Sequence, residues 1–342
     1  MPRLAVLILL AVGAIPLSVA PSQINADESA YRAEVERFQQ AREASLRADD
    51  GWLSVSGLGW LKPGANRIGS DPASEVALRP AAPASVGVLT LPSNEPTTVA
   101  QFQPAPGVAV LLNGRPFEGG AIRSDVDGAG ADVLAVAEFR LILLRRNDRF
   151  ALRVKDNASP TRANFAGCRW FPVNEDWRVI ARFTPHALPK TIRFETTVGG
   201  QDVLPCPGVV SFEHAGQTYR LEAAAEPDGK LWFVFRDATA GATTAANARQ
   251  LTTDAPVGDV VILDFNRAIN LPCAYIEHAT CPIAPPQNRL PLAIPAGERL
   301  PQACHSIPAA GLIALFRDQI KSQNAHCRPK PVWQRSPCQR PN

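Results

Sequence analysis

Apolar residues follow two different periodicities along this chain. Between Ala26 and Asp49, Tyr31, Val35, Phe38 and Leu46 fall near one face of a helix, and Glu, Arg and Gln occupy the remaining positions. The spacing predicts an amphipathic helix over 26–49. We expect its apolar face to pack against the body of the protein and cover a sheet edge, the alternative being a helix that binds a partner.

From residue 51 the pattern changes to short apolar or alternating runs separated by turn residues. The predicted strands are Trp52–Val55, Gly57–Leu61, Val76–Leu78, Gly87–Leu91, Val108–Leu112, Glu138–Leu144, Phe150–Val154, Trp177–Phe183, Thr191–Glu195, Val209–Phe212, Gln217–Leu221, Leu231–Phe235 and Val260–Phe265. Turn residues recur roughly every ten to fifteen positions, a rhythm typical of antiparallel sandwiches and barrels. The pattern therefore predicts a mainly β fold with sandwich-like or barrel-like antiparallel sheets.

The composition agrees with a β-rich body. The 342 residues are 46% hydrophobic and 20% charged, and they include 32 Pro and 23 Gly. Abundant Pro and Gly favour a loop-rich β protein over a helical bundle. We expect a β-rich body over 50–300, as one continuous domain or as two halves of about 50–160 and about 161–300.

The charge is unevenly distributed. Residues 301–342 carry six Lys or Arg and one Asp, although the formal net charge of the whole chain is only +3. This segment is predicted to be a basic, largely disordered tail with a short helix at Leu312–Ile320. The body is mildly acidic and offers no basic face, so no nucleic-acid partner is expected.

The first twenty residues predict export. Arg3 provides a charged start, Leu4–Ile15 is an apolar run, and Ser18-Val19-Ala20 is a small-residue cleavage site. The run is too short to span a bilayer about 30 Å thick, and no later run reaches about 18 apolar residues. We expect a mature protein in the periplasm or outside the cell, without a transmembrane segment.

Seven cysteines are present, and an oxidising compartment would allow pairs to persist. Cys273 and Cys281 enclose seven residues and are the best candidates for a disulfide. Two free thiols are one alternative. A metal site with His278 as a third ligand is another, although no C-x-x-C motif supports it.

Recognised catalytic motifs are missing from the sequence. It contains no G-x-S-x-G, H-E-x-x-H, P-loop or G-x-G-x-x-G motif, and no cofactor is predicted. Two predicted strands do run into polar residues, the first reaching Asp237 and the second Asp264, with Arg249 in the loop between them. Such strand ends line pockets or form turns. The two carboxylates would share a sheet end if the strands were parallel neighbours, and would lie at opposite ends if the strands were an antiparallel pair.

The first half resembles the spacing of forkhead-associated domains in three places: Arg67-Ile68-Gly69-Ser70, Ser85-Val86-Gly87-Val88 and Asn113-Gly114. The resemblance implies a β-sandwich. Those domains bind phosphothreonine through an Arg, and Ser70 stands at that position here, while Val88 replaces a supporting His. Losing the bidentate cation removes the strongest phosphate contact, so phosphopeptide binding is not expected.

Four longer motifs, at 48–72, 152–173, 235–241 and 264–298, resemble the bacterial family known as domain of unknown function 1684. The resemblance covers about residues 30–300. It implies a β-rich domain and supplies no established activity or cofactor.

The chain departs from the pattern of this family in two places. Ala245-Ala246-Asn247-Ala248-Arg249 replaces an expected Tyr-Gly-Gly-Gly-Arg, and Asn270-Leu271-Pro272-Cys273 replaces Asn-Pro-Pro-Cys. The first change removes a stacking surface and a close backbone approach, so a ligand bound there by the family would be held poorly here.

Two functional hypotheses follow. The first is a non-catalytic binding or structural protein of the envelope. The alternative is a small-ligand-binding or hydrolase-like protein with a site near 236–249 and 264–289, in which Asp237 or Asp264 is the base and Arg249 or Arg289 holds an anionic group. The candidate ligand-binding residues are Asp237, Arg249, Asp264, Asn266, Asn270, Asn288 and Arg289. A deep pocket joining the two segments would favour the enzyme, and a filled, hydrogen-bonded loop would favour the structural role.

Overall fold

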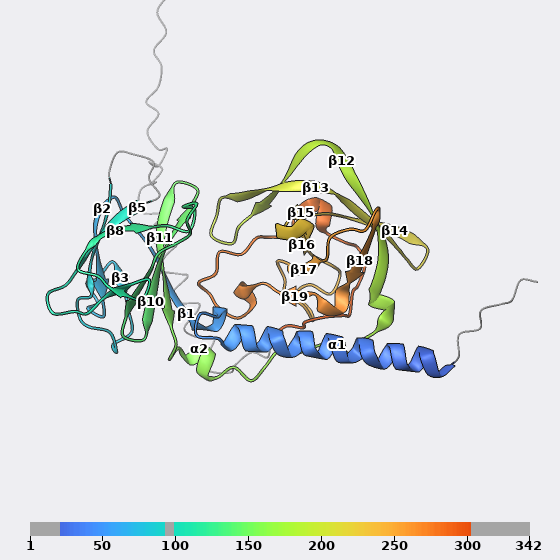
Figure 1. The fold of residues 1–342 in the computed structure, drawn as a ribbon, viewed down its shortest axis with the longest axis horizontal. Helices are drawn as coiled ribbons and strands as arrows, with labels where there is room; N and C mark the ends of the chain where they lie inside the picture. The colour runs from blue at the N-terminus through green and yellow to red at the C-terminus, as the bar shows by residue number, and fades with distance from the viewer. Residues whose placement is uncertain (1–20, 93–98, 302–342) are drawn as a thin grey trace, which may run out of the picture. The chain divides into compact units, whose positions relative to one another are not determined.

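The structure is a computed structural model that describes residues 21–92 and 99–301 (Figure 1). The predicted signal peptide and the predicted helix at Leu312–Ile320 lie outside the described residues, as does the tail apart from its first residue. The fold is mainly β, with several antiparallel sheets and one long N-terminal helix, as the sequence predicts.

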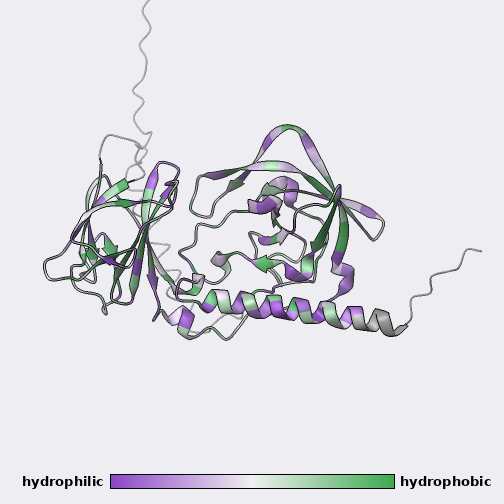
Figure 2. Ribbon diagram, in the orientation of Figure 1, coloured by the Kyte–Doolittle hydropathy of each residue, from purple (hydrophilic) through white to green (hydrophobic). Residues whose placement is uncertain are grey.

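Helix α1 (Pro21–Arg47) is amphipathic, and hydrophobic and hydrophilic residues alternate along it (Figure 2). The side chains of Tyr31, Val35 and Leu46 are buried. Arg42 Nη2 donates to the backbone carbonyl of Asn270, in an edge strand, at 3.0 Å. The helix therefore covers a sheet edge, as predicted. In the described part of the chain, no helix is both long and apolar enough to cross a lipid bilayer.

The first half contains two sheets. One has the order β1-β11-β10-β9-β6-β7 and comprises β1 (Val55–Trp60), β6 (Leu111–Leu112), β7 (Arg115–Pro116), β9 (Val133–Val136), β10 (Phe139–Arg146) and β11 (Arg149–Asp156). The other has the order β3-β2-β4-β5-β8 and comprises β2 (Gly64–Gly69), β3 (Val76–Ala77), β4 (Gly87–Leu91), β5 (Val99–Pro104) and β8 (Gly120–Arg123). All neighbouring strands are antiparallel except β2 and β3, which are parallel.

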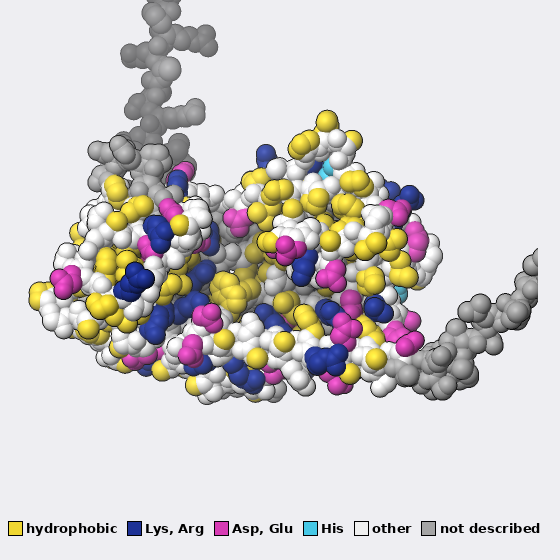
Figure 3. Space-filling view, viewed as in Figure 1, with side chains coloured by type: hydrophobic (Ala, Val, Ile, Leu, Met, Phe, Trp, Pro, Cys, Tyr) yellow, Lys and Arg dark blue, Asp and Glu magenta, His cyan; other side chains and the backbone are white. Residues whose placement is uncertain are grey.

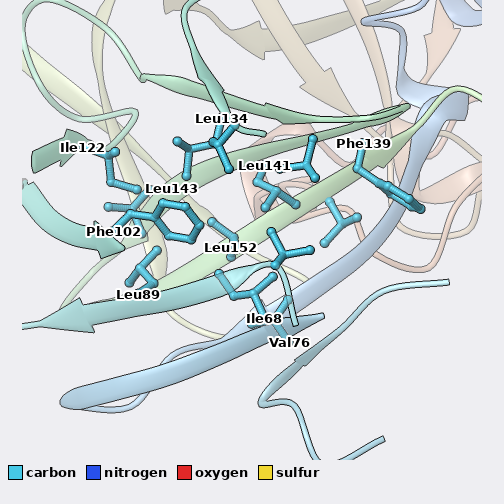
Figure 4. Packing of buried hydrophobic residues seen from close by; sticks show 14 of the residues in the cluster. Ile68, Val76, Leu89, Phe102, Ile122, Leu134, Phe139, Leu141, Leu143 and Leu152 are labelled. Carbon is cyan, nitrogen blue, oxygen red and sulfur yellow. The ribbon is translucent and has the colours of Figure 1, made fainter. Parts of the chain in front are cut away.

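The two sheets pack face to face and form a β-sandwich. Leu89, Phe102 and Ile122 from one sheet meet Leu141 and Leu152 from the other in a fully apolar core (Figure 4). Alternate side chains of a strand point to opposite faces, so each strand supplies the core with every second residue. The forkhead-associated resemblance implies this sandwich architecture.

The residues that carry the forkhead-associated resemblance bond within the chain. Ser70 Oγ donates to the carbonyl of Ala82 at 2.8 Å. Asn113 Nδ2 donates to Asp132 at 2.7 Å, and its Oδ1 accepts from the amide of Val133 at 2.9 Å. These contacts hold neighbouring strands together and leave the phosphopeptide role without support.

The second half also contains two antiparallel sheets. One has the order β14-β13-β12-β18 and comprises β12 (Arg178–Glu195), β13 (Gln201–His214), β14 (Gln217–Glu222) and β18 (Val260–Asp264). The other has the order β15-β16-β17-β19 and comprises β15 (Ala224–Ala225), β16 (Leu231–Phe235), β17 (Arg249–Thr253) and β19 (Ile269–Asn270). Phe212 and Val261 of the first sheet share a buried cluster with Phe233 and Leu251 of the second.

Short helical segments punctuate the chain. Helix α2 (Pro160–Ala163) is capped by Ser159, whose side chain accepts from the amide of Arg162, and Pro160 fits the first helical position. The 3-10 turns are Trp52–Ser54, Glu175–Trp177, Pro227–Gly229, Phe265–Arg267, Pro272–Ala274 and Pro286–Asn288.

Several predicted elements differ from the structure. Trp52–Ser54 forms a 3-10 turn. Of the two runs predicted at Trp177–Phe183 and Thr191–Glu195, Trp177 ends a 3-10 turn and the remainder belongs to the single long strand β12. Arg249 was expected in a loop and instead begins β17, pairing with Phe235. Polar residues dominate the sequence of β17, so no apolar run marks it as a strand.

Candidate functional site

The Arg249 side chain is buried, and its two terminal nitrogens, Nη1 and Nη2, are hydrogen-bonded within the protein. Its Nη2 donates to Asp237 Oδ2 at 2.5 Å, and both side chains are only 1% exposed. The guanidinium also donates to the carbonyls of Ala296 and Ile294, at 2.5 and 3.0 Å. It lies over the ring of Phe235, 5.2 Å from the centroid. Burial lowers the pKa of the Arg249 guanidinium, and the Asp237 charge acts against this shift.

The second oxygen of Asp237 is also engaged. Oδ1 accepts from the amide and the hydroxyl of Thr239 at 2.8 and 2.5 Å, and from the amide of Ile294 at 3.3 Å. Both carboxylate oxygens are thus used in holding the loops around the end of β16. This arrangement forms turns and leaves neither oxygen facing a substrate.

Asp264 belongs to a different contact, the one that fixes helix α1. Its Oδ1 accepts from the amide of Asn266 and from the Tyr31 hydroxyl, at 3.1 and 2.9 Å. Asn266 Nδ2 donates in turn to the Tyr31 hydroxyl at 2.9 Å and to the carbonyl of Asn174 at 2.8 Å. Burial, with the neighbouring Asp264 charge, raises the pKa of the Tyr31 hydroxyl, which keeps it protonated as the donor.

Asp237 and Asp264 do not form one site. Strand β16 pairs with β15 and β17, whereas β18 pairs with β12 in another sheet. Neither the parallel nor the antiparallel pairing considered for these strands occurs. The two strands lie in different sheets, so neither condition stated for their ends applies.

Asn270 bonds to a residue outside the predicted candidates, Glu298. The amide of Asn270 donates to Glu298 Oε2 at 3.0 Å, and its Nδ2 donates to Oε1 at 3.2 Å. Glu298 is fully buried, and Arg42 Nε lies 3.6 Å from Oε2. Burial raises the pKa of Glu298, and Arg42 counteracts the shift. The sequence around Glu298, a single Glu after Ala296-Gly297, contains no pattern that predicts its hydrogen bonds to Asn270.

Asn288 connects two sheets. Its Nδ2 donates to the carbonyls of Glu222 and Val234, at 2.9 and 3.1 Å, and its Oδ1 accepts from the amide of Glu222 at 2.8 Å. Since Glu222 ends β14 and Val234 lies in β16, the amide fixes the loop across both strands. Asn288 is fully buried, so its polar atoms are satisfied by the protein backbone.

Cys273 and Cys281 are in contact as free thiols. The amide of Cys273 donates to Cys281 Sγ at 3.1 Å. The contact with Cys273 and burial raise the pKa of the Cys281 thiol. A disulfide between them stays a prediction. In the described ranges, no three His, Cys, Asp or Glu side chains gather as ligands for a metal ion.

Arg289 differs from the other candidates because it is exposed and lines a groove. The groove has a volume of about 670 Å³ and lies between β12 and the loop Ile283–Arg289; we call it the β12 groove. Lys190, Thr191, Arg193 and Glu195 form one wall. Asp237, Arg249 and Asp264 do not line it, so the groove is not a pocket that joins 236–249 with 264–289.

The ends of the β12 groove are closed by contacts within the chain. At one end the amide of Ile283 donates to the carbonyl of Glu195 at 2.7 Å. At the other, Lys190 Nζ lies 2.6 Å from Glu222 Oε1, and Gln287 Nε2 donates to Glu222 Oε2 at 2.9 Å. Figure 3 shows hydrophobic side chains gathered together with charged ones over the part of the molecule that contains β12 and β13.

Comparison with known proteins supports the resemblance found in the sequence. The model of a protein family of unknown function, DUF1684, matches residues 163–299. The extension of the match to residue 30 stays a prediction. The comparison with curated proteins gives no match.

A solved structure is also similar in sequence. It is the solution NMR structure of an uncharacterized protein of Haloarcula marismortui, with 31% identity. The similarity covers 43% of this chain and 83% of that one, with a TM-score of 0.36. The match to the family model shows that the chain belongs, over residues 163–299, to the DUF1684 family of proteins of unknown function.

Proposed function

We propose that this protein is an exported, non-catalytic binding protein of the cell envelope that holds an anionic ligand in the β12 groove. Export is supported by the charged start, apolar run and small-residue cleavage site within residues 1–20. The absence of a recognisable catalytic motif in the sequence supports a binding role over a catalytic one.

The state of the two candidate bases argues against the hydrolase alternative. A general base needs an oxygen within hydrogen-bond reach of the proton that it removes. Asp237 Oδ2 is bonded to Arg249 and Oδ1 to Thr239. Asp264 Oδ1 is bonded to Tyr31 and Asn266, and its Oδ2 forms an ion pair with Arg267, whose Nε lies 3.2 Å away. These segments thus form the filled, hydrogen-bonded loop that favours the non-catalytic hypothesis.

The charges of the β12 groove carry the proposal. The Lys190 charge is balanced by Glu222. Arg193 and Arg289 are exposed, and in the described residues neither forms an ion pair, whereas Glu195 is the remaining carboxylate of the wall. Arg289 uses its Nε to bond the Ala284 carbonyl at 3.1 Å, which fixes the guanidinium at the groove. Two unpaired guanidinium groups favour a carboxylate ligand because their planar donors match its oxygens.

Binding of anionic probes tests the site. We would titrate the mature protein with citrate and with hexaglutamate by calorimetry, and compare Arg193→Glu and Arg289→Glu with Arg115→Glu. Arg115 is an exposed residue of β7 in the first half and is the matched charge-reversal control. Each groove variant should bind at least tenfold more weakly, since a hydrogen bond between charged groups contributes about 1.5–3 kcal/mol.

The result that would overturn the site is equally specific. If neither probe binds, or if Arg115→Glu weakens binding as much as the groove variants do, the β12 groove is not an anion site. Export is tested separately by the mass of the protein recovered from fractionated cells. Recovery of the protein from the cytoplasmic fraction with residues 1–20 still attached would contradict the export part of the proposal.

A further inference from the structure

Strand β12 has a backbone edge that faces the β12 groove. On one side, residues 190–195 pair with β13. On the other side, β18 pairs only with Arg178–Arg182, so this sheet neighbour ends well before the groove. A strand edge without a neighbour presents a row of N–H and C=O groups that can pair with another extended chain.

The direction of these groups follows from the contact at Glu195. Its carbonyl accepts from Ile283, so the backbone groups of Glu195 point away from β13 and toward the groove. Backbone groups alternate in direction along an antiparallel strand, so Arg193 and Thr191 share this orientation.

The partner of Thr191 in β13 agrees with this orientation. Thr191 lies opposite Pro205. Proline has no N–H to donate, so it fits a position where the facing residue does not exchange hydrogen bonds across the pair. The Ile283–Glu195 hydrogen bond and the Thr191–Pro205 pairing thus both indicate that the backbone groups of Thr191 and Arg193 point away from β13 and toward the β12 groove.

The chain itself pairs with this edge and then leaves it. Pro282 bridges to Thr196 and Ile283 bonds to Glu195, which adds a short extended segment beside the end of β12. Pro285 and Pro286 follow, and without N–H groups they cannot continue the ladder. The loop then turns toward β14 and β16, where Asn288 fixes it.

We propose that the ligand of the β12 groove is an extended acidic peptide segment that adds to β12 as a strand at Thr191 and Arg193. The inference rests on the proposed anion-binding function and specifies its ligand. The peptide backbone exchanges N–H···O=C bonds with both residues, and its acidic side chains bind the guanidinium groups of Arg193 and Arg289. The span Lys190–Phe194, which stops short of the Glu195 carbonyl occupied by Ile283, accommodates about five residues at roughly 3.3 Å each.

Charge favours a peptide of another protein, rather than the chain's own tail, as the occupant of the β12 groove. Residues 301–342 are basic, with six Lys or Arg and one Asp, so they do not complement Arg193 and Arg289. Glu195 and the Lys190–Glu222 ion pair at the ends of the groove favour acidic side chains at its centre and polar ones at its ends.

Backbone methylation of the peptide tests strand addition without changing the protein. The probe is a fluorescent hexapeptide of alternating Glu and Thr, with two twins methylated on the backbone amides at odd or at even positions. Methylation removes the N–H donors of one peptide edge and keeps every side-chain charge. One twin should bind the mature protein at least tenfold more weakly than the parent, and the other should bind about as well.

A protein variant provides the reciprocal test. Thr191→Pro removes an N–H at the free edge and keeps both arginines, and it should weaken binding of the parent peptide at least tenfold if its circular dichroism is unchanged. If both twins bind like the parent, or if citrate binds and the peptide does not, strand addition is wrong and anion binding stands. If neither acidic probe binds, the proposed function itself fails.

Discussion

The two halves of the body treat buried carboxylates differently. In the first half, Asp132 and Asp156 are buried, but their partners Arg123 and Arg79 are 39% and 38% exposed. In the second half, Arg249 and its partner are each 1% exposed. In the first half the arginine of each pair stays in contact with water, whereas in the second half both members of the Arg249 ion pair lie in the interior. Hydrogen bonds to Nη1 and Nη2 of Arg249 and to both oxygens of Asp237 offset part of the desolvation of the two ions.

The difference follows from how each half forms its backbone hydrogen bonds. In the first half most of the chain lies in sheet ladders, which satisfy their own N–H and C=O groups. The 264–298 segment of the second half has little regular structure, and its backbone depends on buried side chains. Arg249 donates to the carbonyls of Ile294 and Ala296 in that segment, and the Glu298 carboxylate accepts from the amide of Asn270. Asn288 ties the segment to the carbonyl of Val234 in β16. Buried polar residues therefore fix the shape of a long loop.

Removing one charge from the interior pair should have the largest effect. Asp237→Asn keeps the size of the side chain but leaves the Arg249 guanidinium buried without its counter-charge, which costs about 3–5 kcal/mol. The same change at Asp156 leaves Arg79 with access to water and should cost about 1 kcal/mol. Urea unfolding of both variants at neutral pH measures the two free energies of unfolding. Equal losses would contradict the distinction between the halves.

The sequence predicts the fold better than the site, for a physical reason. Runs such as Gly87–Leu91 and Leu231–Phe235 are strands because alternation and apolar runs are local properties, and both occur as predicted. Whether Asp237 meets Asp264 depends on which sheet each strand joins, and no local pattern encodes that pairing. The sequence also marks Asp, Asn and Arg after strands without showing whether they face solvent or backbone.

The β12 groove could not be predicted from periodicity. It forms where an extended strand lies beside a Pro-rich loop more than eighty residues later in the chain, and Arg289 was the only predicted candidate that reached it. Arg193 was overlooked because an exposed Arg in a strand is ordinary until its unpaired position beside the groove is known. Long-range pairing therefore decides which exposed charges form a site.

Oxidation of Cys273 and Cys281 should sharpen the comparison, since residues 55–156 contain no cysteine. Two thiols would lose two protons and two electrons to oxidised glutathione, and closing so short a loop should stabilise the protein by about 2 kcal/mol. Trypsin would release both cysteines in the single peptide 268–289, whose mass falls by about two daltons on forming an internal disulfide between two thiols. Urea unfolding with and without reductant measures the effect.

The control for this experiment is Asp156→Asn in the first half. Its destabilisation should be the same in the oxidised and reduced protein, because distant and independent sites add. Recovery of the two cysteines as separate glutathione adducts, with no internal disulfide, would show that the pair does not close in spite of its contact.

The smallest expected effect is a pair of opposite pH dependences. The Arg123 hydrogen bond lowers the pKa of Asp132 to about 2, so its stabilisation, about 1 kcal/mol at this partly exposed pair, is present above pH 4 and lost as pH falls toward 2. Burial raises the pKa of Glu298, so its contribution is greatest below about pH 4 and is lost as pH rises through the folded pKa. The free energy of unfolding would be measured from pH 2 to 8 for each protein. The loss of stability toward pH 2 should be smaller in Asp132→Asn, and the loss of stability as pH rises above about 4 should be smaller in Glu298→Gln. The free energy of unfolding of Glu298→Gln could instead vary with pH in parallel with that of the unsubstituted protein. That result would mean that the Glu298 carboxyl is no more costly to ionise in the folded protein than in the unfolded chain. The contrast between the halves would then rest on the Arg249 ion pair.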